Sequence, residues 1–206
     1  MSDARVESVV RTITEACIEN ETYFGELDSV VGDGDFGFSL ARGFENVLAQ
    51  WDTFDRTDTG TFLQKVAVVM SGRIGGTSGP IWGTAFLRGA GQVKGKQEVT
   101  GADVVSMLRA AIEGIKARGG ADLGEKTLLD ALAPMSDTIE RELGAGTAPA
   151  DIAKAAAVTA REAAEATRPM QARRGRASYT GERSIGSLDP GAVAVAVLAE
   201  RVADTW

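Results

Sequence analysis

The chain has 206 residues and 44% apolar residues, enough for one globular domain with a buried core. Its net charge of −7 disfavours general nucleic-acid binding, and no run of eighteen apolar residues suggests a membrane span. The absence of histidine excludes phosphohistidine chemistry, a Ser-His-Asp triad and a histidine-rich zinc site. With a single cysteine, any metal is expected to be held by oxygen, as Mg²⁺, Ca²⁺ and Mn²⁺ are. The N-terminal residues lack a signal-peptide pattern, which favours the cytoplasm.

The apolar pattern predicts an all-α fold of about eight helices in one domain over residues 1–206. Val6, Val10 and Cys17 share one face of the first helix, with Cys17 as a small core residue and Ser2 or Asp3 as its cap. The later helices are expected at residues 39–48, 61–71, 78–88, 100–120 and 127–143, from 147 or 149 through the alanine-rich run, and at 189–203. Apolar and polar residues do not alternate repeatedly anywhere in the sequence, so no strands are predicted.

Several helix ends carry specific patterns. Thr100 and Asp103 resemble a capping box, and Gly119-Gly120 predict the end of that helix. Pro134 predicts a kink or a short break in the next helix. Asp189 followed by Pro190 is a strong helix start. The segment 168–188 is the longest without a helical pattern, and an irregular segment of that length is usually functional or mobile.

The strongest chemical signal is the group of Asp28, Asp33 and Asp35, the last two within VVGDGDFGFS. Three carboxylates this close repel one another unless a cation joins them. An EF-hand does not fit, because the fifth position from Asp33 is Gly37 and the twelfth is Phe44. Magnesium fits better, since it uses few carboxylates and completes its shell with water and phosphate. A solvated acidic turn that caps a helix is the alternative.

Two further segments suit phosphate. GRIGGTSGP, residues 72–80, leads glycines, Thr77 and Ser78 into a helix N-terminus, which can bind an anion. It lacks the lysine of a Walker A loop, and a plain helix–helix turn is the alternative. The segment 168–188 contains clustered arginines, which suit polyphosphate, or else form a solvated loop or a partner contact. Together these parts predict a site for a magnesium–nucleotide complex.

Four stretches resemble the nucleotide-binding L subunit of dihydroxyacetone kinase over essentially the whole chain. They are LDSVVGDGDFGFSLARGFE, GGTSGP, GEKTLLDAL and GRASYTGERSIGSLDPGA, in the family's order and spacing. The resemblance implies a closed barrel of eight antiparallel helices with a nucleotide, ADP or ATP, at one rim.

The resemblance also implies roles for individual residues. Two Mg²⁺ ions are expected on Asp28, Asp33 and Asp35, and Arg176 is expected to stabilise phosphate charge as the catalytic residue. The expected nucleotide contacts are Phe36, Gly37, Phe38, Ser39, Gly76, Thr77, Ser78, Gly119, Gly120, Leu128, Arg176, Asp189, Pro190 and Gly191.

Partners follow from the same resemblance. A separate K subunit is expected to hold the ketose covalently through a histidine, and a phosphohistidine M subunit to recharge bound ADP in phosphotransferase-linked forms. In other forms ATP exchanges freely. A non-catalytic subunit that binds magnesium–nucleotide and signals to a partner is the alternative.

The chain departs from the family at three positions. Phe36 and Ser187 stand where relatives usually have histidine, and Ser39 stands where they usually have asparagine. None is a metal ligand, so nucleotide binding is expected to persist, while the sugar, which includes a four-carbon ketose such as erythrulose among its candidates, is open.

Overall fold

The computed structural model describes residues 3–96 and 98–206, and within them it is all-α, as predicted, with no β-strand. The helices are α1 (Asp3–Glu19), α2 (Glu21–Ser29), α3 (Phe36–Ala49), the 3-10 helix η1 (Trp51–Thr53), α4 (Thr59–Ser71), α5 (Ser78–Gln92), α6 (Gly101–Gly119), α7 (Leu129–Gly144), α8 (Pro149–Glu165), the 3-10 helix η2 (Arg176–Ser184) and α9 (Pro190–Thr205). Ser2, one of the two expected caps of α1, lies outside the described residues.

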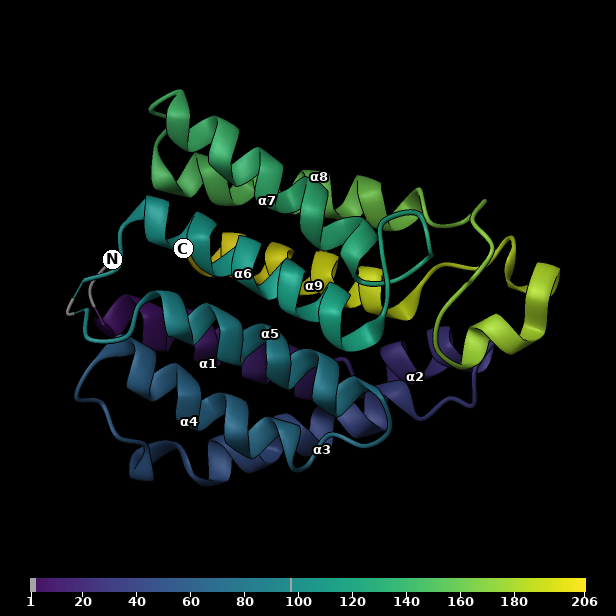
Figure 1. Cartoon of the computed structure of the whole chain (residues 1–206), viewed down its shortest axis with the longest axis horizontal. Coiled ribbons are helices and arrows are strands. Elements are labelled where there is room, and N and C mark those ends of the chain that lie inside the picture. Colours follow the sequence, from purple (N-terminus) through teal and green to yellow (C-terminus); the bar gives the residue numbers. More distant parts are fainter. Residues whose placement is uncertain (1–2, 97) are drawn as a thin grey trace.

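Eight of these helices form a closed ring. In the order α1, α3, α4, α5, α6, α7, α8, α9, each helix packs against the next, and α9 packs back against α1 (Figure 1). The expected barrel of antiparallel helices is thereby confirmed. α2 lies beside the ring and packs mainly on α3.

The antiparallel order sends alternate connections to opposite ends of the barrel. The connections at 30–35, 72–77, 120–128 and 166–189 lie at one end, and both termini lie towards the other (Figure 1). Every segment that the sequence singled out for metal or phosphate is therefore at one rim.

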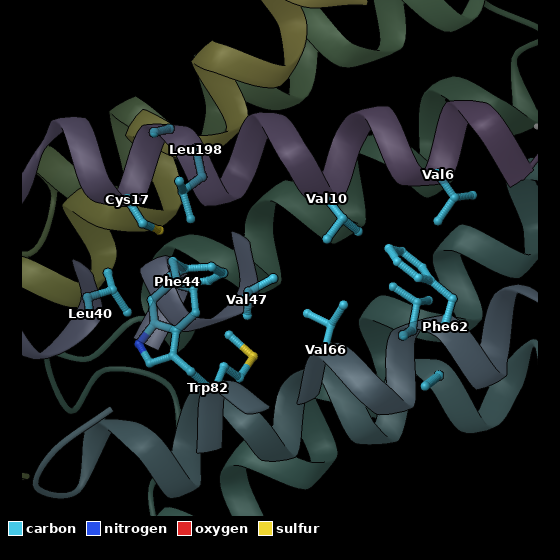
Figure 2. Packing of buried hydrophobic residues seen from close by; sticks show 14 of the residues in the cluster. Val6, Val10, Cys17, Leu40, Phe44, Val47, Phe62, Val66, Trp82 and Leu198 are labelled. Atoms are coloured by element: carbon cyan, nitrogen blue, oxygen red, sulfur yellow. The ribbon is translucent and has the colours of Figure 1, made fainter. Parts of the chain in front are cut away.

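The inside of the ring is apolar. Side chains from α1, α3, α4, α5 and α9 meet in one cluster, which includes Val10, Cys17, Phe44, Val66 and Leu198 (Figure 2). Cys17 is fully buried, as expected, and burial raises the pKa of its thiol. Burying one such side chain contributes about 1.5–3 kcal/mol, so the cluster holds the rim connections on a rigid frame.

The helix-end patterns are confirmed where they rest on local hydrogen bonds. Thr100 and Asp103 form the reciprocal capping box of α6. Gly120 ends α6 in the left-handed conformation, at φ 58°. Asp189 caps α9 by accepting a hydrogen bond from the Ala192 N–H, at 2.7 Å.

Two expectations need correction. The short helix α2 was not expected, because only Phe24 of its nine residues is buried and no apolar stripe marks it. Of the two outcomes expected at Pro134, the break is wrong: α7 runs on through this residue, since the proline withholds a single N–H donor and the helix packs on both α6 and α8. Among the described residues, no helix is both long and apolar enough to cross a membrane.

Candidate metal–nucleotide site

Asp28, Asp33 and Asp35 meet at the rim. Asp28 lies in α2, and the other two lie in the turn that leads to α3. One carboxylate oxygen from each residue lies within 4.8 Å of the others. Asp28 is half-buried and the other two are exposed. The arrangement is a small cup of oxygen ligands that opens to solvent.

Glycines let the turn bend around these carboxylates. The Gly32 N–H donates to the Asp28 carbonyl at 2.6 Å, and a β-carbon at residue 32 would lie 2.2 Å from Asp28 Oδ1. Gly34 has a φ of 77°, which favours glycine. The Phe36 N–H donates to Asp28 Oδ2 at 3.3 Å. At position 32 a larger residue would displace the Asp28 carboxylate.

The titration of one carboxyl group in this cup is shifted from its ordinary range. Partial burial, and then the negative charge of Asp28, raise the pKa of Asp35. A divalent cation would relieve this repulsion, and three hard oxygen donors suit Mg²⁺. The residues present therefore fit a magnesium site.

The glycine-rich connection at 72–77 lies beside the aspartates. Thr77 precedes α5 without a side-chain cap, so its hydroxyl and the first N–H groups of the helix are not used in capping. Gly76 has a φ of 60°, and a β-carbon there would lie 3.9 Å from a terminal nitrogen of Arg176. A β-carbon at Gly75 would lie 3.1 Å from Ser39 Oγ. The connection thus touches both the arginine segment and the start of α3.

Arg176 joins the arginine segment to the aspartates. Its Nη1 forms ion pairs with Asp33 and with Asp35, the latter at 3.0 Å. All three side chains are about half-exposed. The structure therefore brings together the acidic turn, the glycine-rich connection and Arg176, which are far apart in the sequence.

A second group of the expected nucleotide residues lies around the start of α9. A β-carbon at Gly191 would lie 3.2 Å from the Leu128 β-carbon and 3.1 Å from Asp189 Oδ2. A β-carbon at Gly119 would lie 3.1 Å from Ile81 Cδ1 of α5. Leu128 and the Asp189–Gly191 turn are thus in contact, and Gly119 borders α5.

Asp189 has an unusual environment for a helix cap. Loss of hydration raises the pKa of its carboxyl to about 7, and the nearby charge of Asp130 acts in the same direction. The hydrogen bond from Ala192 and the charge of Lys126 act against the shift. A carboxyl of this kind changes its charge near neutral pH.

The four residues after GDGD differ in their burial and in their contacts. Gly37 is buried, and a β-carbon there would lie 1.9 Å from the Glu21 carbonyl, so it serves the contact between α3 and α2. Phe36 packs on Phe24, with ring centroids 6.0 Å apart. Ser39 is buried, whereas the Phe38 ring is exposed and lies near the Arg42 guanidinium.

Sequence reasoning gave no role to Glu125 and Lys126 within GEKTLLDAL. The Glu125 carboxylate forms two hydrogen bonds with Arg174, at 2.6 and 2.9 Å. Lys126 is buried and binds the connection between α8 and α9. A glycine followed by two charged residues just before a helix was the available pattern, but lysine is rarely buried, so it indicated a surface turn.

Comparison with known proteins shows to which family this chain is similar. The family model described as the DAK2 domain matches residues 30–204. The ADP-binding subunit DhaL of the PEP-dependent dihydroxyacetone kinase of Escherichia coli (strain K12) is 35% identical over 181 residues, covering 88% of this chain and 86% of that protein. The L-erythrulose 1-kinase of Mycolicibacterium smegmatis is 38% identical over 198 residues, covering 94% of this chain but 34% of that longer protein.

Solved structures of a dihydroxyacetone kinase have a fold similar to that of this chain. The dihydroxyacetone kinase of C. freundii matches with a TM-score of 0.79 over 100% of this chain and 35% of that one. The same kinase in complex with AMP-PNP and Mg²⁺ matches with a TM-score of 0.78. At 23% identity these matches show the fold. From the family match and its close relatives, the chain belongs to the DAK2 domain family, together with the DhaL subunits of dihydroxyacetone kinase.

Proposed function

We propose that the chain is the nucleotide-binding subunit of a cytoplasmic dihydroxyacetone-type kinase. In this role it binds ADP or ATP with two Mg²⁺ ions and transfers a phosphoryl group to dihydroxyacetone or a related short-chain ketose. The ketose is held by a separate K-type subunit.

One observation carries the proposal: three carboxylates within 4.8 Å share a rim with a helix N-terminus and with Arg176. Carboxylates alone suit a cation, and a helix N-terminus alone suits an anion. Their combination suits a ligand that is an anion bound through a metal, as a nucleotide polyphosphate is.

The relatives support the substrate class. Their names refer to dihydroxyacetone, L-erythrulose and D-erythrulose, all short ketoses. Over most of its length the chain matches relatives named as ADP-binding subunits of PEP-dependent or PTS-dependent kinases. This favours the form in which ADP stays bound and an M-type phosphohistidine subunit recharges it.

Each part of the site has a role in phosphoryl transfer. Bound Mg²⁺ neutralises phosphate charge and aligns the transferred group. Asp28, Asp33 and Asp35 act as ligands, and the metal competes with Arg176 for the charge of Asp33 and Asp35. Thr77, Ser78 and the first N–H groups of α5 hold phosphate oxygens. Arg176, already at the aspartates, stabilises the charge that develops on the phosphoryl group.

The base end of the nucleotide is assigned to the second group of residues. The Asp189–Gly191 turn lies against Leu128, and Gly119 and Gly120 end α6 at the same rim, so glycines form part of the border of the proposed base site. A planar base can approach such a border closely because the glycines carry no side chain.

Asp33→Asn tests the metal assignment. Asparagine has nearly the shape of aspartate but no charge, so Mg-ADP is expected to bind at least about tenfold more weakly while the helical circular dichroism is unchanged. Isothermal titration measures the affinity. Unchanged affinity would exclude Asp33 as a ligand. Transfer of phosphate to dihydroxyacetone or erythrulose in the presence of a K-type subunit then separates a kinase subunit from a regulator that only binds nucleotide.

A further inference from the structure

Lys126 is a buried lysine at the rim, where a lysine side chain is unexpected. Its residue is 3% exposed, and its φ of 62° is the one positive value found at a non-glycine position among the described residues. Burial lowers the pKa of its ammonium group. Both features are costly, so contacts elsewhere must compensate for them.

The compensating contacts all come from one segment. The Lys126 ammonium donates to the carbonyls of Met170, Ser184 and Ser187, at 3.1 Å for the first and 2.8 Å for the last. It also lies 3.2 Å from Ser187 Oγ. These acceptors belong to the two ends of the connection between α8 and α9, so one ammonium joins the start of the segment to its end.

The segment 168–188 has a closed stem and an open tip. In the stem, the Gly186 N–H donates to the Arg168 carbonyl at 2.8 Å, and the Ala172 N–H donates to Ser184 Oγ at 2.9 Å. The fully buried Ser184 lies inside the stem, and the tip extends outward with Arg176 at the start of η2. The stem, together with the contacts of Arg173 and Arg174 with Glu125, therefore limits where the Arg176 side chain can reach.

Lys126 is itself held by the start of α7. Asp130 accepts hydrogen bonds from the Gly124 N–H, at 2.5 Å, and from the Thr127 N–H, at 2.8 Å. The backbone on both sides of Lys126 is thus fixed to the ring. Through its hydrogen bonds, the ammonium holds segment 168–188 against this fixed backbone.

We propose that Lys126 is a positioning residue for the phosphoryl-transfer site, because it closes the stem of segment 168–188 and so places Arg176 at Asp33 and Asp35. The proposal depends on the proposed function for its catalytic meaning. Its structural content, an ammonium that reinforces the hydrogen bonds of the stem, can be measured without nucleotide.

The physical reason is the lack of an equivalent donor. Three carbonyls converge on the ammonium, and a lysine offers three N–H groups on one atom. Without it, the part-buried carbonyls of Met170 and Ser187 lose their ammonium donor and the Ser184 carbonyl keeps only the Ser187 hydroxyl, although hydrogen bonds to a charged group are among the strongest in proteins. The stem then opens so that water can reach those oxygens, and the tip loses its fixed place.

Lys126→Met is the main test, because methionine keeps most of the apolar chain of the lysine side chain and removes the charge. Amide hydrogen exchange at Ala172 and Gly186 is expected to accelerate at least about tenfold, with little change in α1 and α4. The affinity for Mg-ADP is expected to fall by a similar factor, because the closed state is less populated. Lys154→Met is the matched control, since Lys154 is an exposed lysine of α8, and it is expected to change neither value.

Chemical rescue separates positioning from a general packing role. Lys126→Ala lacks a three-carbon chain and its ammonium, which n-propylammonium supplies. This ion is expected to restore slow exchange at Ala172 and Gly186 and to tighten Mg-ADP binding, whereas n-propanol fills the same space without the charge and is expected to restore neither.

Three results would overturn the proposal: unchanged stem exchange in Lys126→Met, equal acceleration throughout the chain, or equal rescue by n-propanol. Ser187→Ala provides a milder variant should both lysine variants fail to fold, and stem exchange that stays at the wild-type rate would also count against it. If wild-type protein binds no Mg-ADP, the proposed function fails, while the exchange and its rescue still decide the role of Lys126.

Discussion

At the scale of single residues, Arg176 has two competing roles, as an ion-pair partner of the carboxylates and as a phosphate contact. It forms ion pairs with Asp33 and Asp35, which are the proposed metal ligands. The guanidinium of Arg176 and a magnesium ion would compete for the same two carboxylates. Arg176 therefore acts as the counter-ion of these carboxylates, and we expect a bound metal to replace it there and leave it available to phosphate.

Arg176→Gln is expected to move two affinities in opposite directions. Without nucleotide, Mn²⁺ used as a probe for Mg²⁺ should bind roughly two- to fivefold more tightly, since exposed ion pairs of about 0.2–1 kcal/mol each no longer compete. With nucleotide, Mg-ADP should bind about tenfold more weakly, because a charge-assisted contact with phosphate is lost. Isothermal titration measures both.

Arg183→Gln is the control for this prediction. It removes the same charge from the same segment, and Arg183 forms no ion pair within the part of the chain that the structure describes. It should leave the Mn²⁺ affinity nearly unchanged. A parallel loss of both affinities in Arg176→Gln would contradict competition between the arginine and the metal.

At the scale of elements, the contact between α2 and α3 sets the geometry of the acidic turn. Gly37 lies where the two helices are closest, and a β-carbon there would meet the Glu21 carbonyl at 1.9 Å and the Gly25 nitrogen at 2.6 Å. Backbone atoms cannot rotate away as a side chain can. Gly37→Ala should therefore separate the helices, lower the free energy of unfolding by about 1–3 kcal/mol and weaken Mg-ADP binding.

Gly91→Ala is the matched control for that substitution. Gly91 is also helical, but a β-carbon there would meet nothing within 4 Å. Its substitution is expected to stabilise the protein by up to about 1 kcal/mol, because alanine favours helix more than glycine does. Urea denaturation measures both variants. Equal effects of the two substitutions would show that the close approach at Gly37 is unimportant.

The start of α9 should make stability depend on pH. The pKa of Asp189 is about 7 in the folded protein, against about 4 for an ordinary aspartate. Between those values the folded protein binds more protons than the unfolded chain, so the contribution is complete below about pH 4 and is lost as the pH rises through 7. The loss has an upper bound of about 4 kcal/mol.

Asp189→Asn tests this dependence. Asparagine cannot ionise but can still accept the hydrogen bond from Ala192, so the helix cap is retained. The free energy of unfolding, followed by urea titration from pH 4 to pH 8, should vary less in the variant than in the wild-type protein. An identical pH profile for both proteins would locate the dependence at another group.

At the scale of the whole molecule, the sequence predicted what is local and missed what is distant. The α6 capping box, the α9 start and the three aspartates depend on residues within a few positions of one another. Closure of the ring between α1 and α9 involves contacts such as the ion pair of Glu19 with Arg201, which no periodicity reveals. The approach of Arg176 to Asp35 spans 141 residues; residue composition suggested that the arginine segment joins the acidic turn, and only the family resemblance singled out Arg176.

The buried contacts were the hardest to foresee. Lys126 and the glycine of the α2–α3 contact owe their roles to neighbours that the sequence does not place beside them. α2 was missed because a helix held at the side of the ring needs only one buried side chain. Pattern analysis therefore predicted the helices and the candidate ligands, the family resemblance predicted the closed barrel, and the structure revealed the contacts that position the candidate ligands.

The separation of the barrel into two ends leads to a prediction for the complete protein. All of the proposed ligand contacts lie at one rim, in or next to the connections 30–35, 72–77, 120–128 and 166–189. Saturating Mg-ADP should slow amide exchange in these connections and leave those at 50–58 and 144–148 unchanged. At a free concentration one hundred times the dissociation constant, binding should also stabilise the protein by about 2.7 kcal/mol and raise its melting temperature. EDTA should abolish both effects, because the phosphates reach the aspartates through the metal. Protection at the opposite end, or stabilisation that survives EDTA, would mean that the nucleotide binds elsewhere on the barrel.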